Sequence, residues 1–240
     1  SIVYNFDHLI EEDVDLLIDY STNYDVAVLV AQKASDRGIP LIMVDLPVHN
    51  AVYFGANNVL AGRIAGEKAS EWVQRRWDGS VDAVISLERE TAGSACKQRV
   101  LGSIDALRDG VMFKRSGIRH IDCSRGFSYY AHKLERHLER LPPDAKCLVF
   151  SFAEDITADT HELIRQYSRE RRIVVVGQNF SYNIQQVMET DESPLIGCVS
   201  YHQELYGERI MDIAIRMMEQ RPVEPINYTD HEWIANDPLW

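Results

Sequence analysis

The sequence has no long hydrophobic run, no surplus of positive charge and no leader-like start. No apolar run among its 240 residues approaches the roughly 18 residues of a membrane-spanning helix. Its 25 Lys and Arg are outnumbered by 37 Asp and Glu, for a formal net charge of −12, whereas phosphate binding needs clustered Lys and Arg. We therefore expect a soluble protein whose direct partner is not nucleic acid.

No pair of the four cysteines has the spacing of a redox motif or a metal site. Cys96, Cys123, Cys147 and Cys198 are widely spaced, with neither a CxxC pair nor a Cys/His ligand spacing. A chain of this length builds its core without disulfides, so we expect reduced thiols that are buried or half-buried. This pattern predicts no metal and no cofactor, and it slightly favours a reducing compartment.

The sequence also has none of the common catalytic signatures. It contains no nucleophile elbow, P-loop, GxGxxG or HExxH motif. Cys96 has no histidine at a spacing that indicates a nucleophile pair. Asp45 and Glu154 can be read as the acid and base of a glycoside hydrolase, but carboxylates in a sugar-binding cleft explain them equally well. We expect that the protein is not an enzyme.

What the sequence does have is an alternation of short apolar runs and longer segments of helical periodicity. The expected strands are 14–18, 39–44, 81–87, 118–122, 146–152, 173–176 and 195–200. The expected helices are 24–37, 58–77, 95–108, 127–141, 155–170, 182–190 and 203–220. For the first of these helices, the expected apolar stripe is Val26, Leu29, Val30 and Ala34. Such alternation predicts right-handed βαβ units and parallel sheets covered on both faces.

Polar and aromatic residues follow most of the expected strands. Ligands of open parallel sheets bind beyond the carboxyl ends of the strands, so these residues are candidates for a binding site. They are Asp45, 88–91, 122–125, 152–155, Gln178 with Asn179, and Tyr201 with His202.

Six stretches, collinear in order and spacing, carry a resemblance that covers nearly the whole chain. They are KASDRGIPLIMVD (33–45), FGANNVLAGRIAGEKA (54–69), RVLGSIDAL (99–107), LVFSFAEDITADT (148–160), IVVVGQNF (173–180) and IGCVSYHQELYGERIMDIAIRMMEQRPV (196–223). The sequence resembles the sugar-binding branch of the type I periplasmic-binding-protein fold. Solute-binding proteins of ABC importers and effector domains of LacI/GalR-type repressors share this fold.

The resemblance implies an α/β protein of two lobes, each a parallel, doubly wound sheet, with a ligand cleft between them. Residues 1–57 and 203–227 would form the N-terminal lobe, and residues 58–201 and 228–240 the C-terminal lobe. Three hinge crossovers would lie near Asn57, near Tyr201 and at 227–233. The family normally begins with a strand-helix-strand unit for which this sequence shows no counterpart, so we expect an incomplete N-terminal lobe.

The resemblance also assigns the polar residues that would bind the ligand. Asp45 matches the cleft aspartate that accepts hydrogen bonds from sugar hydroxyls. Arg99 matches the arginine whose planar fork binds adjacent hydroxyls. Glu154 stands where the family often has asparagine, and Asp155 is expected to cap the following helix. Asn179 replaces a usual aspartate, which puts a standard pyranose in doubt. The alternative for each residue is a solvent-facing or ion-paired side chain.

Four further candidates would contribute aromatic or amide contacts. Tyr201 matches a hinge position and can stack on a sugar face or bond through its hydroxyl. Gln178 occupies an adjoining slot that is often aromatic. Phe127 and Tyr129 would offer an aromatic wall, although Phe127 fits the core equally well.

The function that follows is reversible binding of a small sugar or polyol, as the solute-binding component of an ABC-type importer. The partners would then be the sugar and a membrane permease, and the protein would be periplasmic or extracytoplasmic. The alternative is a cytoplasmic effector-binding domain of a LacI/GalR-type regulator, which would contact DNA only through an N-terminal head outside this sequence. A homodimer is consistent with either function.

Overall fold

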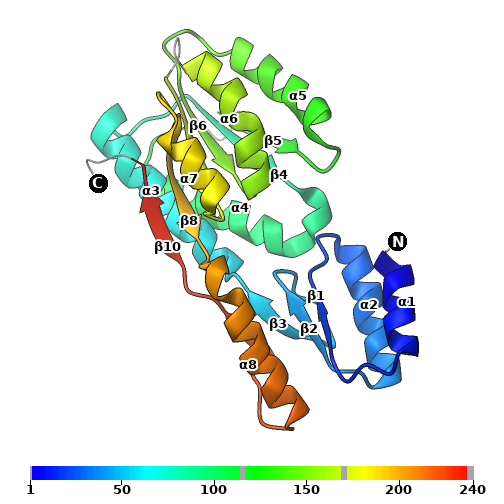
Figure 1. The fold of residues 1–240 in the computed structure, drawn as a ribbon. Coiled ribbons are helices and arrows are strands. Elements are labelled where there is room, and N and C mark those ends of the chain that lie inside the picture. The colour runs from blue at the N-terminus through cyan, green and yellow to red at the C-terminus, as the bar shows by residue number, and fades with distance from the viewer. Residues whose placement is uncertain (1, 114–116, 169–171, 237–240) are drawn as a thin grey trace. The chain divides into compact units, whose positions relative to one another are not determined.

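The computed structural model describes residues 2–113, 117–168 and 172–236, and the chain divides into two compact units (Figure 1). The first unit comprises Ser1–Asn57, Thr91–Ala95 and His202–Asp230. The second comprises Asn58–Glu90, Cys96–Tyr201 and His231–Trp240.

The first unit is built on a four-stranded parallel sheet in the order β1-β2-β3-β9. Its strands are β1 (Leu17–Asp19), β2 (Leu41–Val44), β3 (Val52–Gly55) and β9 (Ile226–Tyr228). Its helices are α1 (Ile2–Glu11), α2 (Tyr24–Arg37) and α8 (Tyr206–Met218), with a 3₁₀ turn at Gln203–Leu205 before α8. One hydrophobic core joins α1 and α2 to β1 and β2, and Leu17, Leu41 and Met43 contribute to it from the strands.

Local signals explain where α2 begins and ends. The side chain of Asn23 accepts hydrogen bonds from the backbone N–H groups of Asp25 and Val26, which caps the first turn. Gly38 ends the helix in the left-handed conformation, at φ 68°. The predicted apolar stripe was wrong at Leu29, which is 43% exposed. The buried face is Ala27, Val30, Ala31 and Ala34, because these residues recur at i, i+3, i+4 and i+7.

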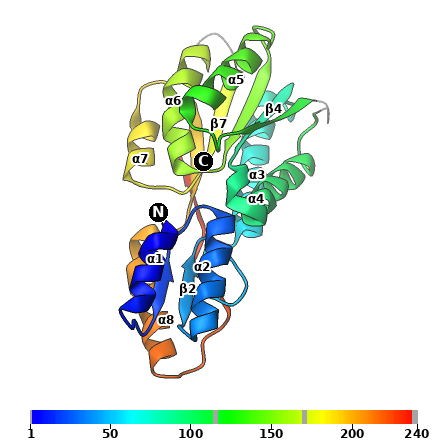
Figure 2. The ribbon, with the colours of Figure 1, turned by 90° about the vertical axis from the view of Figure 1, so that its right-hand side faces the viewer.

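The second unit is built on a six-stranded sheet in the order β10-β8-β7-β6-β4-β5. Its strands are β4 (Ala83–Glu88), β5 (Ile118–Asp122), β6 (Lys146–Ser151), β7 (Arg172–Gln178), β8 (Leu195–Ser200) and β10 (Glu232–Ala235). Its helices are α3 (Asn58–Trp77), α4 (Gly93–Arg108), α5 (Phe127–Glu139), α6 (Glu154–Ser168) and α7 (Tyr182–Glu189), with a 3₁₀ turn at Glu90–Ala92. One core joins α5, α6 and α7 to the sheet, and α3 contacts β7, β8 and β10. Figure 2 shows α6 and α7 to one side of β7 and α3 to the other.

Helices α3 and α4 approach each other closely because α3 presents glycine at the crossing. A Cβ added at Gly62 would lie under 3.0 Å from the carbonyl oxygen of Arg99, and one at Gly66 under 3.0 Å from that of Ser103. The hydroxyl of Ser103 also donates a hydrogen bond to the carbonyl oxygen of Gly62, at 3.0 Å. This contact sets the position of the α4 backbone at Arg99.

The C-terminal part of the chain differs from the prediction in two ways. Residues 228–230 were assigned to the C-terminal lobe, but they belong to the first unit. The reason is that β9 pairs with β3, and the backbone N–H of Thr229 donates to the carbonyl oxygen of Gly55 at 2.9 Å. The second sheet is not wholly parallel either, because β10 pairs antiparallel with β8.

Candidate ligand-binding site

In the first unit, Asp45 directly follows β2 in a left-handed conformation, at φ 60°. Its Oδ1 accepts a hydrogen bond from the backbone N–H of Ala56 at 3.3 Å and another from the hydroxyl of Tyr206 at 3.0 Å. The carboxylate lies so close to β3 that a Cβ at Gly55 would be under 3.0 Å from Oδ1. Asp45 is therefore a half-buried acceptor, fixed at the carboxyl end of the sheet.

In the second unit, Arg99 projects from α4 and is held from two sides. Its Nε and Nη2 donate to Oδ1 of Asn58, at 3.0 and 2.6 Å, and its Nη1 donates to the carbonyl oxygen of Phe152 at 2.9 Å. The guanidinium carbon also lies 5.1 Å from the centre of the Tyr201 ring, a cation–π distance. These contacts fix the plane of the guanidinium before any ligand arrives.

Gln178 and Tyr201 form a buried hydrogen-bonded pair beside this arginine. The hydroxyl of Tyr201 donates to Oε1 of Gln178 at 2.5 Å, and Nε2 of Gln178 donates to the carbonyl oxygen of Ala61 at 3.2 Å. Gln178 is 1% exposed and Tyr201 is 3% exposed. The pair therefore lies against Arg99 and joins β7, and the residue that follows β8, to α3.

Glu154 and Asn179 form a second polar cluster at the same edge of the sheet. Oε2 of Glu154 accepts a hydrogen bond from Nδ2 of Asn179 at 3.1 Å, and Oε1 accepts one from the hydroxyl of Ser181 at 2.5 Å. Asn179 has a left-handed backbone, at φ 71°. Its Oδ1 is buried and has no hydrogen-bond partner among the described residues. A buried acceptor without a partner is costly, so this oxygen is suited to a donor from a ligand or a water molecule.

Asp155 does not cap α6 as predicted, because the helix already begins at Glu154. Its carboxylate instead pairs with the guanidinium of Arg89, from the loop after β4.

Phe127 and Tyr129 lie in the first turn of α5, where both are partly exposed. The Phe127 ring packs edge-on against Tyr130, with centroids 5.5 Å apart. The Tyr129 ring lies between two cations, with Cζ of Arg125 at 4.2 Å and Nζ of Lys133 at 4.4 Å from its centre. Their role as an aromatic wall for the ligand stays a prediction.

The thiols are unsuited to nucleophilic chemistry. Burial raises the pKa of Cys123 and of Cys147 to about 12, from an ordinary value of 9.0, and it also raises the pKa of Cys198. The side chain of Cys96 lies outside the described residues. Within the part of the chain that the structure describes, no group of three His, Cys, Asp or Glu side chains could hold a metal ion.

A separate cavity of about 610 Å³ lies in the first unit. It borders the beginnings of β2, β3 and β9, whereas the candidate site follows the ends of the strands. None of its lining residues is Lys, Arg, Asp or Glu; they are Tyr24, Ile39, Pro40, Leu41, Pro47, Val48, His49, Asn50, Ala51, Val52, Tyr53, Met217, Pro225 and Ile226.

The chain is similar in structure to sugar-transport proteins. A subunit of an ABC sugar transporter from Rhodobacter sphaeroides 2.4.1 is 18% identical, with a TM-score of 0.79 over 97% of this chain and 82% of its own. An ABC transporter solute binding protein from Agrobacterium vitis with bound D-fucose is 17% identical, with a TM-score of 0.78 over 97% of this chain and 79% of its own. Another from Agrobacterium vitis with bound allitol is 15% identical, with a TM-score of 0.79 over 99% of this chain and 81% of its own.

This chain has the type I periplasmic-binding-protein fold. The fold predicted from the six sequence stretches is confirmed. No protein-family model and no curated protein matches the sequence, so the similarity lies in the fold. None of the helices that the structure describes combines the length and the apolar character of a membrane span.

Three residues that hold the candidate site residues in place were not predicted. Asn58 accepts hydrogen bonds from Arg99, the Ser181 hydroxyl donates one to Glu154, and the Tyr206 hydroxyl donates one to Asp45. Asn58 is the first residue of α3 and Ser181 is the N-cap of α7, positions where polar residues are common whether or not they bind anything else. Tyr206 is 161 positions from Asp45, and no local pattern in the sequence could have joined them.

Proposed function

We propose that this protein reversibly binds a small sugar or polyol, as the solute-binding component of an ABC-type importer. Asp45 would contribute from the first unit, and Arg99, Glu154, Asn179 and Tyr201 from the second. The observation that supports the proposal most directly is the placement of Arg99. Protein hydrogen bonds hold its planar guanidinium at the carboxyl edge of the second sheet. The bound D-fucose and allitol of two structural neighbours support the ligand class.

The polar groups suit a neutral, hydroxyl-rich ligand. Guanidinium N–H groups are donors only, carboxylate oxygens are acceptors only, and a side-chain amide offers both. A vicinal diol both donates and accepts, so it can be satisfied by Arg99 together with Glu154. Because the guanidinium and carboxylate are already held by protein groups, little side-chain entropy remains to be lost on binding.

Catalysis is not part of the proposal. The thiols of Cys123, Cys147 and Cys198 are buried, with raised pKa values, and Glu154 is engaged by two hydrogen-bond donors. A carboxylate held in this way is suited to binding hydroxyls. The partners would be a sugar and a membrane permease, and the location would be extracytoplasmic, by analogy with the neighbours.

A thermal-shift panel of D-fucose, D-galactose, D-arabinose, D-fructose and allitol tests the proposal. A ligand that binds only the native state stabilises it by RT ln(1 + [L]/Kd), about 2.7 kcal/mol at 100-fold excess over Kd. We expect one or a few members to raise the melting temperature, and mass spectrometry to recover each sugar unchanged. Turnover of a bound sugar would instead indicate an enzyme.

Substitution at Arg99 then tests the site. Arg99→Ala should weaken sugar binding by roughly 2–4 kcal/mol, about 30- to 900-fold in Kd. The matched control is Arg165→Ala, which removes a partly buried arginine paired with Glu162 three residues earlier, and it should leave Kd unchanged. Asp45→Asn should weaken binding while keeping an oxygen acceptor for Tyr206. Calorimetry that finds full affinity in both Arg99→Ala and Asp45→Asn would overturn the assignment of these residues.

A further inference from the structure

The exposed face of α5 carries a stripe of cations in a chain that is otherwise acidic. Tyr129, Lys133, Arg136 and Arg140 follow one another at intervals of four, three and four residues, which places them on one side of the helix. Arg125 joins them by lying against the ring of Tyr129. We call these five residues the α5 stripe.

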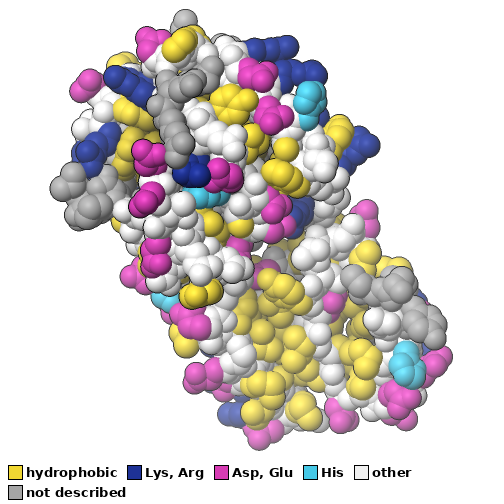
Figure 3. All heavy atoms as spheres, turned by 45° about the horizontal axis from the view of Figure 1, so that its top comes forward, with side chains coloured by type: hydrophobic (Ala, Val, Ile, Leu, Met, Phe, Trp, Pro, Cys, Tyr) yellow, Lys and Arg dark blue, Asp and Glu magenta, His cyan; other side chains and the backbone are white. Residues whose placement is uncertain are grey.

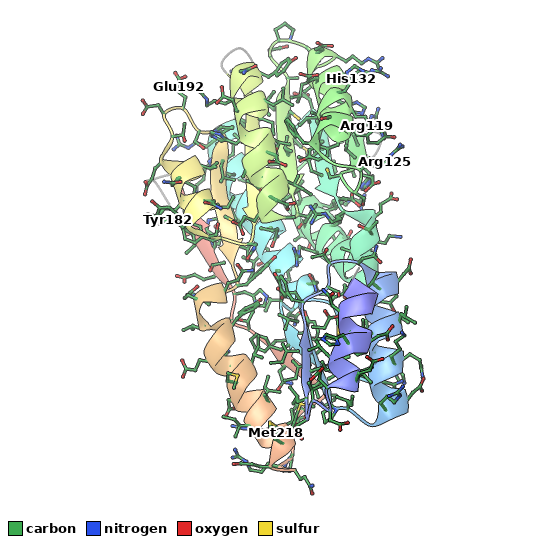
Figure 4. All side chains as sticks on the ribbon, turned by 45° about the vertical axis from the view of Figure 1, so that its right-hand side comes forward. Arg119, Arg125, His132, Tyr182, Glu192 and Met218 are labelled. Carbon is green, nitrogen blue, oxygen red and sulfur yellow. The ribbon has the colours of Figure 1, made fainter. Side chains whose placement is uncertain are left out.

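The α5 stripe extends toward the neighbouring edge strand. Figure 4 shows Arg119 of β5, Arg125 and His132 on the same side of the second unit, and Figure 3 shows Lys, Arg and His side chains gathered along its upper right margin. The pKa of His137 is lowered by burial first and then by Arg119, Arg140 and Arg136, so positive charge is concentrated there.

The cations of the α5 stripe are gathered on one helix face, and none of them forms an ion pair with the described residues there, although Lys133 lies near enough to Asp122 to help lower the pKa of that carboxyl after burial raises it and its hydrogen bonds lower it. Within the described residues, no carboxylate lies within ion-pair distance of Arg125, Lys133, Arg136 or Arg140. Nine other cations do contact a carboxylate: Lys33, Arg63, Lys68, Arg89, Arg108, Arg165, Arg209, Arg216 and Arg221. Acidic residues outnumber basic ones by 37 to 25 in this chain, so a helix face on which four cations gather runs against the overall composition.

Helix stability does not account for the α5 stripe. Cations near the C-terminus of a helix interact favourably with its dipole, which explains Arg136 and Arg140. Arg125, however, lies two residues before the first helical residue, at the end of the helix where the dipole repels positive charge. The first turn contains no acidic residue, and Gly126 offers no side-chain cap. The positive charge at this end of α5 therefore destabilises the first turn of the helix. This indicates that Arg125 serves an interaction other than helix stability.

We infer that the α5 stripe is a docking surface for a short carboxylate-rich segment of a partner protein. Arginine forks bind carboxylates with two parallel hydrogen bonds, and the ring of Tyr129 adds a flat apolar contact between Arg125 and Lys133. The net charge of −12 disfavours the alternatives. It repels a long polyanion or an anionic membrane, whereas a short acidic segment experiences mainly the field within about 10 Å of the surface.

The test measures binding of a fluorescein-labelled (Glu-Gly)₆ peptide by fluorescence anisotropy. We expect binding at about 0.01 M salt that is lost near 1 M salt, because the screening length falls from about 30 to about 3 Å. The triple variant Arg125→Ala/Lys133→Ala/Arg136→Ala should weaken binding at least about tenfold, or 1.4 kcal/mol. The double variant Arg125→Lys/Arg136→Lys keeps the charge but loses the planar fork, so it should bind more weakly than the native protein and more tightly than the alanine triple.

The matched control is Arg108→Ala/Arg165→Ala/Arg216→Ala, which changes the net charge equally at three paired arginines. It should weaken peptide binding less than about twofold. Equal weakening by the two alanine triples would show that only net charge matters and would overturn the inference. So would a native protein that fails to bind the peptide at low salt, or one that binds a single-stranded oligonucleotide or phosphatidylglycerol vesicles more tightly through the same residues. Circular dichroism melting confirms that each variant is folded.

Discussion

Replacing Gly62 by alanine tests the close approach of α3 and α4 that positions Arg99. In most helices, this substitution stabilises by about 1 kcal/mol, because glycine has the more flexible unfolded chain. At Gly62 the added Cβ would lie under 3.0 Å from the carbonyl oxygen of Arg99. That neighbour is backbone, so it cannot turn aside as a flexible side chain can.

The expected cost follows from the distance. Relieving the overlap requires the two helices to separate by roughly 1 Å, because carbon contacts are optimal near 3.5–4.0 Å. Overpacking of this kind costs about 1–3 kcal/mol, which exceeds the gain from helix propensity. We expect a net loss of about 1–2 kcal/mol and a fall in melting temperature of about 2–8 °C, at about 2–4 °C per kcal/mol for a chain of this size.

Gly207→Ala is the matched control, since it makes the same change in a helix. A Cβ at Gly207 would meet nothing within 4 Å, so this variant should be unchanged or more stable by up to about 1 kcal/mol. Circular dichroism melting of both variants measures the difference. If Gly62→Ala is as stable as Gly207→Ala, then the close crossing of α3 and α4 does not constrain the fold and the reasoning is wrong. If Gly62→Ala remains folded but binds sugar more weakly than Gly207→Ala, then the displacement of α4 has moved Arg99.

Two further predictions concern a hydrogen bond and the buried thiols. Tyr206→Phe removes the hydroxyl that donates to Asp45, so it should lower the free energy of unfolding by about 1 kcal/mol. The control Tyr228→Phe changes a residue that is 50% exposed and should leave that free energy unchanged. Equal melting temperatures for the two variants would contradict this prediction. Cys123 and Cys147, whose pKa values burial raises to about 12, should escape iodoacetamide at pH 8.5 in the folded protein, as peptide mass mapping would show. Because the folded pKa is raised, the stability these thiols contribute is present below pH 9 and is lost as the pH rises toward 12, so denaturation midpoints should fall over that interval.

The positions of most helices and strands were determined by local patterns in the sequence. The predicted bounds of α2, α3, β5 and β8 match the structure. Helical periodicity acts over three or four residues, and caps such as Asn23 act within one turn, so these signals do not depend on the rest of the chain. The residues placed after the strands, such as Asp45 and Asn179, were also found from the pattern alone, because polar groups end each apolar run.

What those residues contact was decided only by the tertiary structure. Arg99 meets Asn58 and Phe152, at separations of 41 and 53 positions, because α4 crosses α3 at glycine and its first half lies beside the residue that follows β6. Residues 228–230 join the first unit because β9 adds to the edge of β3. Pairing between strands so distant in sequence depends on which edges remain open once the sheet has formed, and hydrophobic periodicity carries no information about that choice.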